Sequence, residues 1–230
     1  CDATYTIFIL VYDRTIVNND EFMATNTGEI SEKTAAMKQI KDEVVACRKC
    51  ALCEFRRQNN YFPVIGQGNH CAKIMFVGEA PGTNEAKTGR PFCGATGKIL
   101  DELLSSAGIE REEVYIGNVL KDRPPGNRNP QPEEIAACTP YLERQIEIIN
   151  PEVIGALGNF SAAFLLEKYG LKDKIQGISK IHGQIFETGP EFGGKIIVPL
   201  YHPAVAVYNA NMKEILKNDF QILARRIGKN

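Results

Sequence analysis

Four short apolar runs constrain the fold of this chain more than any other feature. They occupy residues 73–78, 114–119, 153–158 and 195–200. None of them alternates apolar and polar residues, as a strand with one solvent-exposed face would. Continuous apolar runs of this length are typical of strands that are buried on both faces of a parallel sheet. We therefore expect four buried strands.

Helical patterns occupy the intervals between these runs. Apolar residues recur at helical spacing over residues 97–107, 132–149 and 161–169, and an amphipathic segment closes the chain over residues 211–227. Because strands and helices alternate, we expect an α/β fold, namely a three-layer α/β/α sandwich around a central, mainly parallel four-stranded sheet. In such a sheet ligands bind beyond the carboxyl ends of the strands, so side chains that follow a strand are the first candidates for a site.

Composition excludes several classes of protein. The chain has 230 residues, of which 43% are hydrophobic and 24% are charged, so it is not generally disordered. A net charge of −1 excludes a uniformly basic coat but allows a local basic patch. We expect one domain over residues 36–230, located in the cytoplasm and without a membrane partner.

The first 35 residues are expected to be a disordered or non-native extension. Residues 5–12 form the only long apolar run, which is shorter than the roughly 20 residues that cross a bilayer and lacks the flanks of a signal peptide. Met23 is a candidate for the natural start, and an additional strand over residues 5–12 is the alternative. The polar residues 24–35 are expected to form a flexible lead-in.

A long glycine-rich loop follows the first predicted strand. It contains Gly78-Glu79-Ala80-Pro81-Gly82 and, further along, Gly89-Arg90-Pro91-Phe92-Cys93-Gly94. It lacks the Gly-Lys-Ser/Thr of a P-loop and the Gly-x-Gly-x-x-Gly of a dinucleotide site. Loops of this length in a compact domain are usually functional. Phe92 is therefore either a stacking surface for a planar ligand or a core residue.

Polar residues also follow the second and fourth predicted strands. Asn118 ends the second strand, and its carboxamide can both donate and accept a hydrogen bond. The proline-rich loop 121–130 holds three cations, which suit a phosphate backbone; a solvated turn is the alternative. His202 follows the fourth strand, and Pro203 restricts the backbone after it.

Seven cysteines lie at positions 1, 47, 50, 53, 71, 93 and 138. Their odd number and low density argue against a disulfide scaffold. Three of them fall in the run Cys47-x-x-Cys50-x-x-Cys53. This spacing indicates a metal or iron–sulfur site in a reducing compartment.

Taken in order, these motifs resemble those of the family 4 uracil-DNA glycosylases, which carry an iron–sulfur cluster. The likeness covers about residues 40–225 and includes Gly-Glu-Ala-Pro-Gly, Gly-Arg-Pro-Phe-x-Gly-x-x-Gly, the strand-ending Asn118 and Tyr201-His202-Pro203. The resemblance implies a DNA repair enzyme that hydrolyses the N-glycosidic bond of deoxyuridine, releases uracil and leaves an abasic site. It also implies uracil-containing DNA as the partner, and we expect a monomer.

The resemblance further implies a role for each residue of a base pocket. Phe92 would stack on the base, Asn118 would read it, and Glu85 would exclude the 5-methyl group of thymine. His202 would donate a hydrogen bond to O2 of the departing uracil. Glu79 would assist the hydrolysis, but the sequence does not identify it as the general base. The remaining residues expected in the pocket are Gly78 and Ala80.

A second set of residues is expected to contact DNA. Cations and a proline of the loop after the second strand would hold the phosphates, and apolar residues after His202 would fill the gap left by the flipped nucleotide. The set comprises Lys121, Arg123, Pro124, Arg128, Val205 and Tyr208, with Val207 as a further candidate.

The cysteines match the family with one departure. Three of the four ligands of a [4Fe–4S] cluster are present, namely Cys47, Cys50 and Cys138. At the fourth position the chain has Asp122. Three interpretations stay open: Asp122 is a carboxylate ligand, Cys53 or Cys71 replaces it, or the cluster is three-iron, labile or absent. We favour Asp122, and zinc held by the same four residues is the alternative metal.

Three rival functions remain open from the sequence. A related glycosylase would act mainly on hypoxanthine, xanthine or another deaminated base. A binding protein would recognise uracil-containing or single-stranded DNA without releasing the base. A small electron-transfer protein would use a cluster alone and would leave Asn118 and His202 without a task.

Overall fold

A mostly parallel six-stranded sheet forms the centre of the molecule. The computed structural model describes residues 19–228, with side chains from residue 28 onward. The strand order is β1-β3-β2-β4-β6-β5. Its four central strands are the four that the apolar runs predict: β2 (Ile74–Gly78), β3 (Tyr115–Asn118), β4 (Val153–Leu157) and β6 (Ile196–Leu200). Every neighbouring pair among these four is parallel, which confirms the expected sheet.

Two further strands lie at the edges of the sheet and were not expected. β1 (Gln67–Gly68) pairs antiparallel with β3, and β5 (Phe186–Glu187) pairs antiparallel with β6. A strand of two residues has no periodic pattern, so the hydrophobic pattern cannot indicate it.

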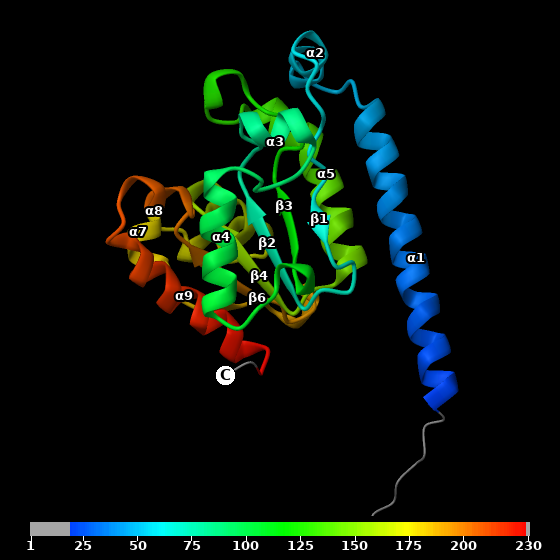
Figure 1. The fold of residues 1–230 in the computed structure, drawn as a ribbon, viewed down its shortest axis with the longest axis vertical. Coiled ribbons are helices and arrows are strands. Elements are labelled where there is room, and N and C mark those ends of the chain that lie inside the picture. Colours follow the sequence, from blue (N-terminus) through cyan, green and yellow to red (C-terminus); the bar gives the residue numbers. More distant parts are fainter. Residues whose placement is uncertain (1–18, 229–230) are drawn as a thin grey trace, which may run out of the picture.

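Helices cover both faces of the sheet, as the three-layer prediction requires (Figure 1). Ile74 and Phe76 of β2 belong to an apolar core shared with α4 (Ala95–Ser106) and α9 (Met212–Arg226). Met75 and Val77 face the opposite way, into a core shared with α5 (Pro132–Ile149) and α6 (Asn159–Lys168). Because successive residues of a strand point to opposite faces, both faces demand apolar residues, and this explains the unbroken apolar run.

The amino-terminal helix is the largest departure from expectation. α1 (Asn19–Ala46) includes residues 24–35, for which a flexible lead-in was expected, and this part of the prediction is wrong. Figure 1 shows α1 running beside α5 and extending past the body of the molecule. Its last turns bury Met37, Ile40 and Val44, while residues 28–34 are mostly exposed and carry no apolar stripe. The predictions for residues 1–18, including the alternative strand, lie outside the described residues.

Short elements complete the fold. They are α2 (Leu52–Gln58), α3 (Thr83–Thr88), α7 (Ile178–Ile181), α8 (Ala204–Tyr208) and 3-10 turns at Arg111–Glu113, Pro125–Asn127, Lys172–Lys174 and Pro190–Phe192. Within residues 19–228, none of the helices combines the length and the apolar character needed to span a bilayer. The register pairs Gly78 with Asn118 at the carboxyl ends of β2 and β3, so the loops that follow these strands start at one edge of the sheet.

Candidate active site

A cavity of about 310 Å³ opens beyond the carboxyl ends of β2, β3 and β6. Side chains of four separate segments meet there, although they are distant in the sequence. The walls comprise Glu79, Ala80, Pro81, Gly82, Glu85, Phe92, Thr96, Asn118, Pro124, Asn127, Arg128 and His202. The structure thus brings together all the residues expected in the base pocket except Gly78, which lies directly behind the wall.

Gly78 allows the close packing that fixes Asn118. A Cβ atom on Gly78 would lie 2.4 Å from Asn118 Oδ1 and 3.3 Å from the Phe92 ring. No larger residue fits without displacing the carboxamide. Asn118 itself is 2% exposed, so its side chain is held in one place before any ligand arrives.

Phe92 is both a core residue and a wall of the cavity, so the two alternatives for it are compatible. Its backbone has a φ of +48°, a left-handed conformation that a bulky residue rarely adopts. Arg111 supports this conformation, because its Nη2 donates hydrogen bonds to the carbonyls of Pro91 at 2.9 Å and Phe92 at 3.3 Å. The ring stacks on His202 with centroids 5.6 Å apart and planes at 30°.

Glu85 fixes the loop that carries Phe92. Its Oε1 accepts hydrogen bonds from the backbone N–H groups of Cys93 at 3.1 Å and Gly94 at 3.3 Å. A Cβ on Gly82 would approach its other carboxylate oxygen to 2.6 Å, so the carboxylate lies between two turns of backbone. The sequence predicts Glu85 in the pocket, but its bonds to the Phe92 loop were not foreseen.

His202 is held as a neutral imidazole. Burial lowers the pKa of His202 to about 4. Its Nδ1 accepts a hydrogen bond from the backbone N–H of Ala204 at 3.2 Å. A neutral ring that accepts at Nδ1 carries its proton on Nε2. His202 therefore offers an N–H donor in the wall of the cavity.

Lys121 supports the end of β3 from inside the protein. It is 1% exposed, and its Nζ donates to the Asn118 carbonyl at 2.8 Å and to Gln145 Oε1 at 2.6 Å. Gln145 in turn donates to the Ile65 carbonyl and to the Tyr115 hydroxyl. Burial lowers the pKa of Lys121 to about 8. The expected contact of Lys121 with DNA is thus contradicted, and the role of Gln145 was missed because a mid-helix glutamine gives no signal in the sequence.

Comparison with known proteins assigns this arrangement to a family. The family model "Uracil DNA glycosylase superfamily" matches residues 65–224. A type-4 uracil-DNA glycosylase of Saccharolobus solfataricus is 47% identical over 184 residues, which are 79% of this chain and 82% of the relative. Another, of Archaeoglobus fulgidus, is 44% identical over 195 residues, or 84% of this chain and 94% of the relative.

The chain belongs to the uracil-DNA glycosylase superfamily. A third type-4 member, from Sulfurisphaera tokodaii, is 46% identical over 81% of this chain and 82% of its own length. A type-5 uracil-DNA glycosylase of Thermus thermophilus is 33% identical over 61% of this chain and 68% of its own length. Both the expected family and the expected type-4 branch are therefore confirmed.

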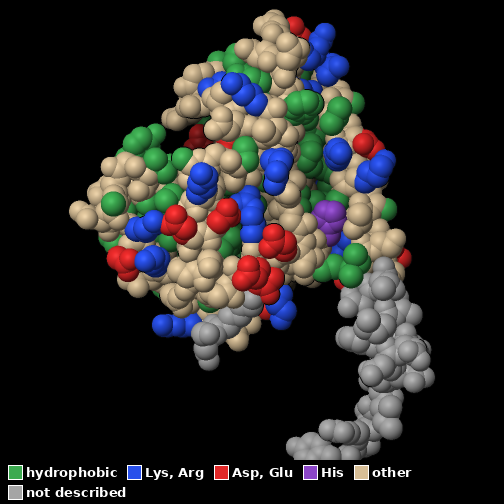
Figure 2. Space-filling model, viewed as in Figure 1, with side chains coloured by type: hydrophobic (Ala, Val, Ile, Leu, Met, Phe, Trp, Pro, Cys, Tyr) green, Lys and Arg blue, Asp and Glu red, His purple; other side chains and the backbone are tan. Residues whose placement is uncertain are grey.

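The rim of the pocket in this family member carries fewer free cations than expected. Arg128 is exposed at the cavity, but it also forms a two-bonded ion pair with the buried Glu134 at 2.6 and 2.9 Å. Arg123 lies over the Tyr61 ring at 6.0 Å, and its Nε is buried without a hydrogen-bond partner. On the face shown in Figure 2, Lys and Arg side chains are scattered among Asp and Glu.

The short helix α8 borders the cavity on the side of His202. Val205 is half-buried and lines an adjoining groove of about 530 Å³ that also contacts Glu79 and His202. Tyr208 is 89% exposed at the end of the same helix, and Val207 is also exposed. Burial raises the pKa of the Glu79 carboxyl, which lies where the cavity and the groove meet.

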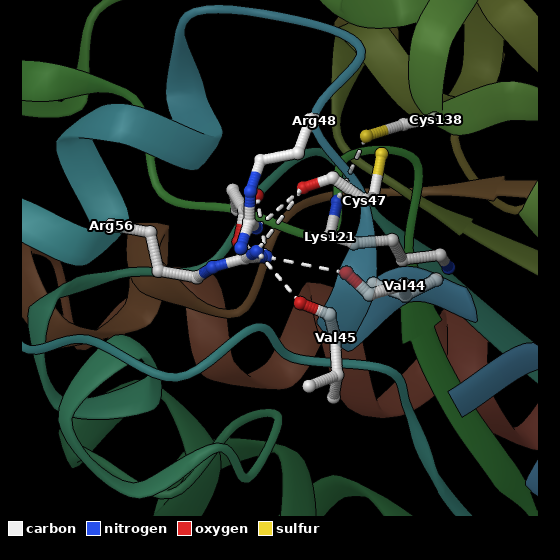
Figure 3. A network of polar contacts seen from close by, with 8 residues as sticks. Val44, Val45, Cys47, Arg48, Arg56, Lys121 and Cys138 are labelled. Carbon is white, nitrogen blue, oxygen red and sulfur yellow. Dashed lines mark hydrogen bonds and ion pairs between the residues drawn. The ribbon is translucent and has the colours of Figure 1, made fainter. Parts of the chain in front are cut away.

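The three cysteines expected to be cluster ligands gather near the end of β3. Cys138 Sγ accepts a hydrogen bond from the Lys121 N–H at 3.5 Å, and Cys50 packs on the same small core as Cys138. Figure 3 shows the sulfur atoms of Cys47 and Cys138 beside each other. The Tyr141 phenol lies near both thiols. Burial raises the pKa of Tyr141 to about 12, and Cys47 and Cys138 contribute to the increase. Cys71 precedes β2 and so lies at the amino-terminal ends of the parallel strands, opposite the ends where the other three cysteines are found.

Asp122 does not complete a four-ligand site. Both of its carboxylate oxygens accept hydrogen bonds from Arg56 Nη1 at 3.0 Å, and both side chains are buried. Across the described residues, no group of three or more His, Cys, Asp and Glu side chains has the arrangement of a metal site. The three thiols suit a soft metal centre, but the residues present do not fit a cluster with four protein ligands.

Proposed function

We propose that this chain is a uracil-DNA glycosylase, which hydrolyses the N-glycosidic bond of deoxyuridine in DNA, releases uracil and leaves an abasic site. The type-4 relatives at 44–47% identity support the assignment. The single observation that carries it is the neutral His202 in the wall of a cavity that also holds Asn118 and Phe92, with the acceptor nitrogen of the ring already occupied by Ala204.

The pocket recognises a flipped uracil by stacking and hydrogen bonding. Phe92 provides an aromatic surface, and base stacking of this kind contributes about 1–3 kcal/mol. The Asn118 carboxamide accepts a bond from N3–H and donates one to O4. Cytosine presents an acceptor at N3 and a donor at N4, so it would leave both amide groups mismatched and buried, which is costly.

His202 stabilises the leaving group. As the glycosidic bond breaks, negative charge develops on the uracil, including its O2 atom. An Nε2–H donor aimed at O2 gains strength with this charge and therefore stabilises the transition state more than the ground state. A neutral donor is suited to this task, because it leaves the proton with the enzyme and requires no protonation before the reaction.

The two glutamates have different proposed roles. Glu85 holds the loop of Phe92 and thereby the wall that faces the 5-position of the base, where it excludes thymine. Glu79 lies at the junction of cavity and groove and is placed to assist the attacking water.

Contacts with DNA are proposed for the rim of the cavity. Arg128 and Pro124 lie at the cavity, and Arg123 belongs to the same loop. Val205 and Tyr208 on α8 are placed to fill the space that the flipped nucleotide vacates.

We also propose an iron–sulfur cluster on Cys47, Cys50 and Cys138, whose soft thiolates suit iron. The contribution of such a group here is structural, because it would join the segment after α1 to the loop after β3 and to α5. No chemical step passes through it.

The test is release of free uracil from a uracil-containing oligonucleotide, with hypoxanthine and xanthine oligonucleotides assayed in parallel. We expect uracil to be released fastest. His202→Gln and Asn118→Ala should each lose about 2–4 kcal/mol of transition-state stabilisation, seen in kcat/KM. His70→Gln, which lies away from the cavity beside Tyr115, is the matched control and should retain activity.

Two outcomes would contradict the proposal. Faster release of hypoxanthine or xanthine would favour the related glycosylase. Tight binding of uracil-containing DNA without any free base would favour the non-catalytic binder.

A further inference from the structure

The turn that carries Phe92 is held from outside the cavity by Arg111. This arginine lies in the 3-10 turn before β3 and not in the walls of the cavity. Its Nη2 donates to the carbonyls of Pro91, at 2.9 Å, and Phe92, at 3.3 Å. Its Nη1 donates to the carboxylate of Asp101 on α4, the helix that follows the turn. Because a guanidinium is planar and rigid, the anchor at one nitrogen fixes the direction of the other.

The Phe92 backbone depends on support of this kind. Its left-handed conformation, with a φ of +48°, is unfavourable for a bulky residue and persists only where the surroundings impose it. Gly97 packs against the same carbonyl, since a Cβ atom there would come within 1.8 Å of the Phe92 oxygen. The carbonyl therefore contacts both the first turn of α4 and the Arg111 guanidinium, which leaves it little freedom to rotate.

Arg111 and Glu85 hold opposite ends of the peptide groups around Phe92. Glu85 accepts hydrogen bonds from the two N–H groups that follow Phe92, whereas Arg111 donates to the carbonyls of Phe92 and of the residue before it. Each charge thus binds the end of the backbone dipole that it attracts. Glu85 also lines the cavity, so its substitution changes the wall directly. Arg111 reaches the pocket through Phe92.

The Phe92 ring connects this support to the proposed leaving-group donor. The ring stacks on His202, with centroids 5.6 Å apart and planes at 30°. A rotation of the Phe92 backbone would therefore change two parts of the pocket together, namely the surface for the base and the packing of the His202 ring. A displacement of about 1 Å at reacting groups can slow a reaction about 100-fold.

We propose that Arg111 is a positioning residue of the glycosylase reaction, which holds the Phe92 backbone so that the ring is aligned with His202 and with the base. The inference rests on the proposed function, because that reaction uses the ring and the imidazole together. In this role Arg111 acts through Phe92 and does not contact the base.

The kinetics of uracil release test the role in the reaction. Arg111→Met removes the donors, Arg111→Lys keeps one cationic donor, and Asp101→Ala removes the anchor at an exposed site. The control Arg226→Met removes an arginine that is also paired with a carboxylate, at the end of α9. All assays are run well below the unfolding midpoint of each variant, so that loss of folded protein does not contribute.

We expect kcat of Arg111→Met to fall about 10- to 100-fold, because the reacting groups are misaligned. KM for DNA should change less than about threefold, because most of the affinity for DNA comes from contacts with the phosphates. Arg111→Lys and Asp101→Ala should lose less, and Arg226→Met should behave as the wild type.

The proton NMR signals of His202 test the same alignment without DNA. The chain has three histidines, so the ring signals of His202 are identified by their loss in His202→Gln. Because an aromatic ring shifts the signals of protons near its face, a loosened Phe92 should move the His202 signals in Arg111→Met. Those of His70 and His182 should stay in place, and Arg111→Lys should show a smaller change.

Unmoved His202 signals in Arg111→Met would overturn the positioning role, and so would an unchanged kcat. Equal losses in Arg111→Met and Arg111→Lys would also overturn it, because the hydrogen bonds would then not matter. If Arg111→Met does not fold, Asp101→Ala decides by the same two measurements. A wild type that releases no uracil would refute the proposed function, whereas the spectra would still show whether Arg111 holds Phe92 against His202.

Discussion

At the scale of single residues, side chains held by fixed hydrogen bonds determine the shape of the pocket. Lys121 and His202 both illustrate this. The sequence indicates Lys121 as a DNA-binding cation, but in the structure its amine is a buried donor to the Asn118 carbonyl. His202 is expected to act as a hydrogen-bond donor, and the Ala204 N–H fixes the orientation of its ring. A surface cation would contribute to the salt dependence of DNA binding, whereas a buried donor would affect activity through the position of Asn118.

Lys121→Met should impair activity without altering electrostatic binding to DNA. The substitution leaves the Asn118 carbonyl and Gln145 Oε1 without their donor, at a cost of about 1–3 kcal/mol. We expect kcat/KM for uracil release to fall about 10- to 100-fold and the salt dependence of DNA binding to stay as in the wild type. Lys98→Met, an exposed lysine on α4, is the control. A shallower salt dependence in Lys121→Met would instead support a phosphate contact.

His202 should make stability depend on pH. In the unfolded chain a histidine binds a proton as the pH falls below about 6.5, whereas the folded protein holds His202 neutral until about pH 4. The unfolded state therefore binds more protons in this window, and the free energy of unfolding decreases as the pH falls through it. At pH 5 the decrease from this group is about 2 kcal/mol.

Chemical denaturation of the wild type and His202→Gln between pH 7 and pH 4.5 measures this effect. The difference in free energy of unfolding between the two proteins should shift in favour of His202→Gln as the pH falls. A constant difference over the whole range would show that folding leaves the pKa of His202 unchanged, and would contradict the neutral imidazole.

At the scale of elements, the loop between β2 and α4 behaves as one unit held by Glu85. The left-handed backbone of Phe92 is adjacent to the two N–H groups that Glu85 binds, so loss of these bonds frees the stacking ring. The hydrogen bonds need an oxygen acceptor but not a negative charge. The two available substitutions, to alanine and to glutamine, therefore separate a positioning role from a charge effect.

Glu85→Ala should lower kcat/KM for uracil about 10- to 100-fold, and Glu85→Gln should restore most of it because its amide oxygen still accepts both bonds. Release of thymine from the same oligonucleotide, measured alongside uracil, tests whether the loop also excludes the 5-methyl group. Equal losses in both variants would mean that the charge of Glu85, and not its position, is what the reaction requires.

At the scale of the whole molecule, charge is nearly balanced, with a net charge of −1. We therefore expect binding to DNA to depend on a few cations near the cavity. Arg128→Gln should reduce the slope of log Kobs against log salt concentration by about one unit and weaken binding to any DNA sequence. Lys217→Gln on α9, which removes an equally exposed cation away from the cavity, should leave the slope unchanged. Identical slopes in the wild type and Arg128→Gln would mean that Glu134 alone engages this arginine.

The sequence predicts the layers and the pocket well because both depend on local patterns. The four unbroken apolar runs have to be buried on both faces, and the polar residues after them have to meet at one edge, where Asn118, Phe92 and His202 are found. The rest depends on contacts between distant residues. Nothing local to Lys121 distinguishes a buried amine from a surface one, and the pairing of Asp122 with Arg56 is visible only when α2 packs on the loop.

The first turns of α1 can unfold locally without unfolding the rest of the domain. This helix packs on α5 and makes no strand hydrogen bonds, and Arg56 contacts it only at its carboxyl end, where it donates to the Val45 carbonyl. Its exposed turns, residues 28–34, can unwind while the sheet stays intact. Native-state hydrogen exchange should therefore show a gradient of protection along α1. Amides near residue 28 should exchange almost freely, those near Val44 should be slower, and those of β2 should exchange only when the whole domain unfolds.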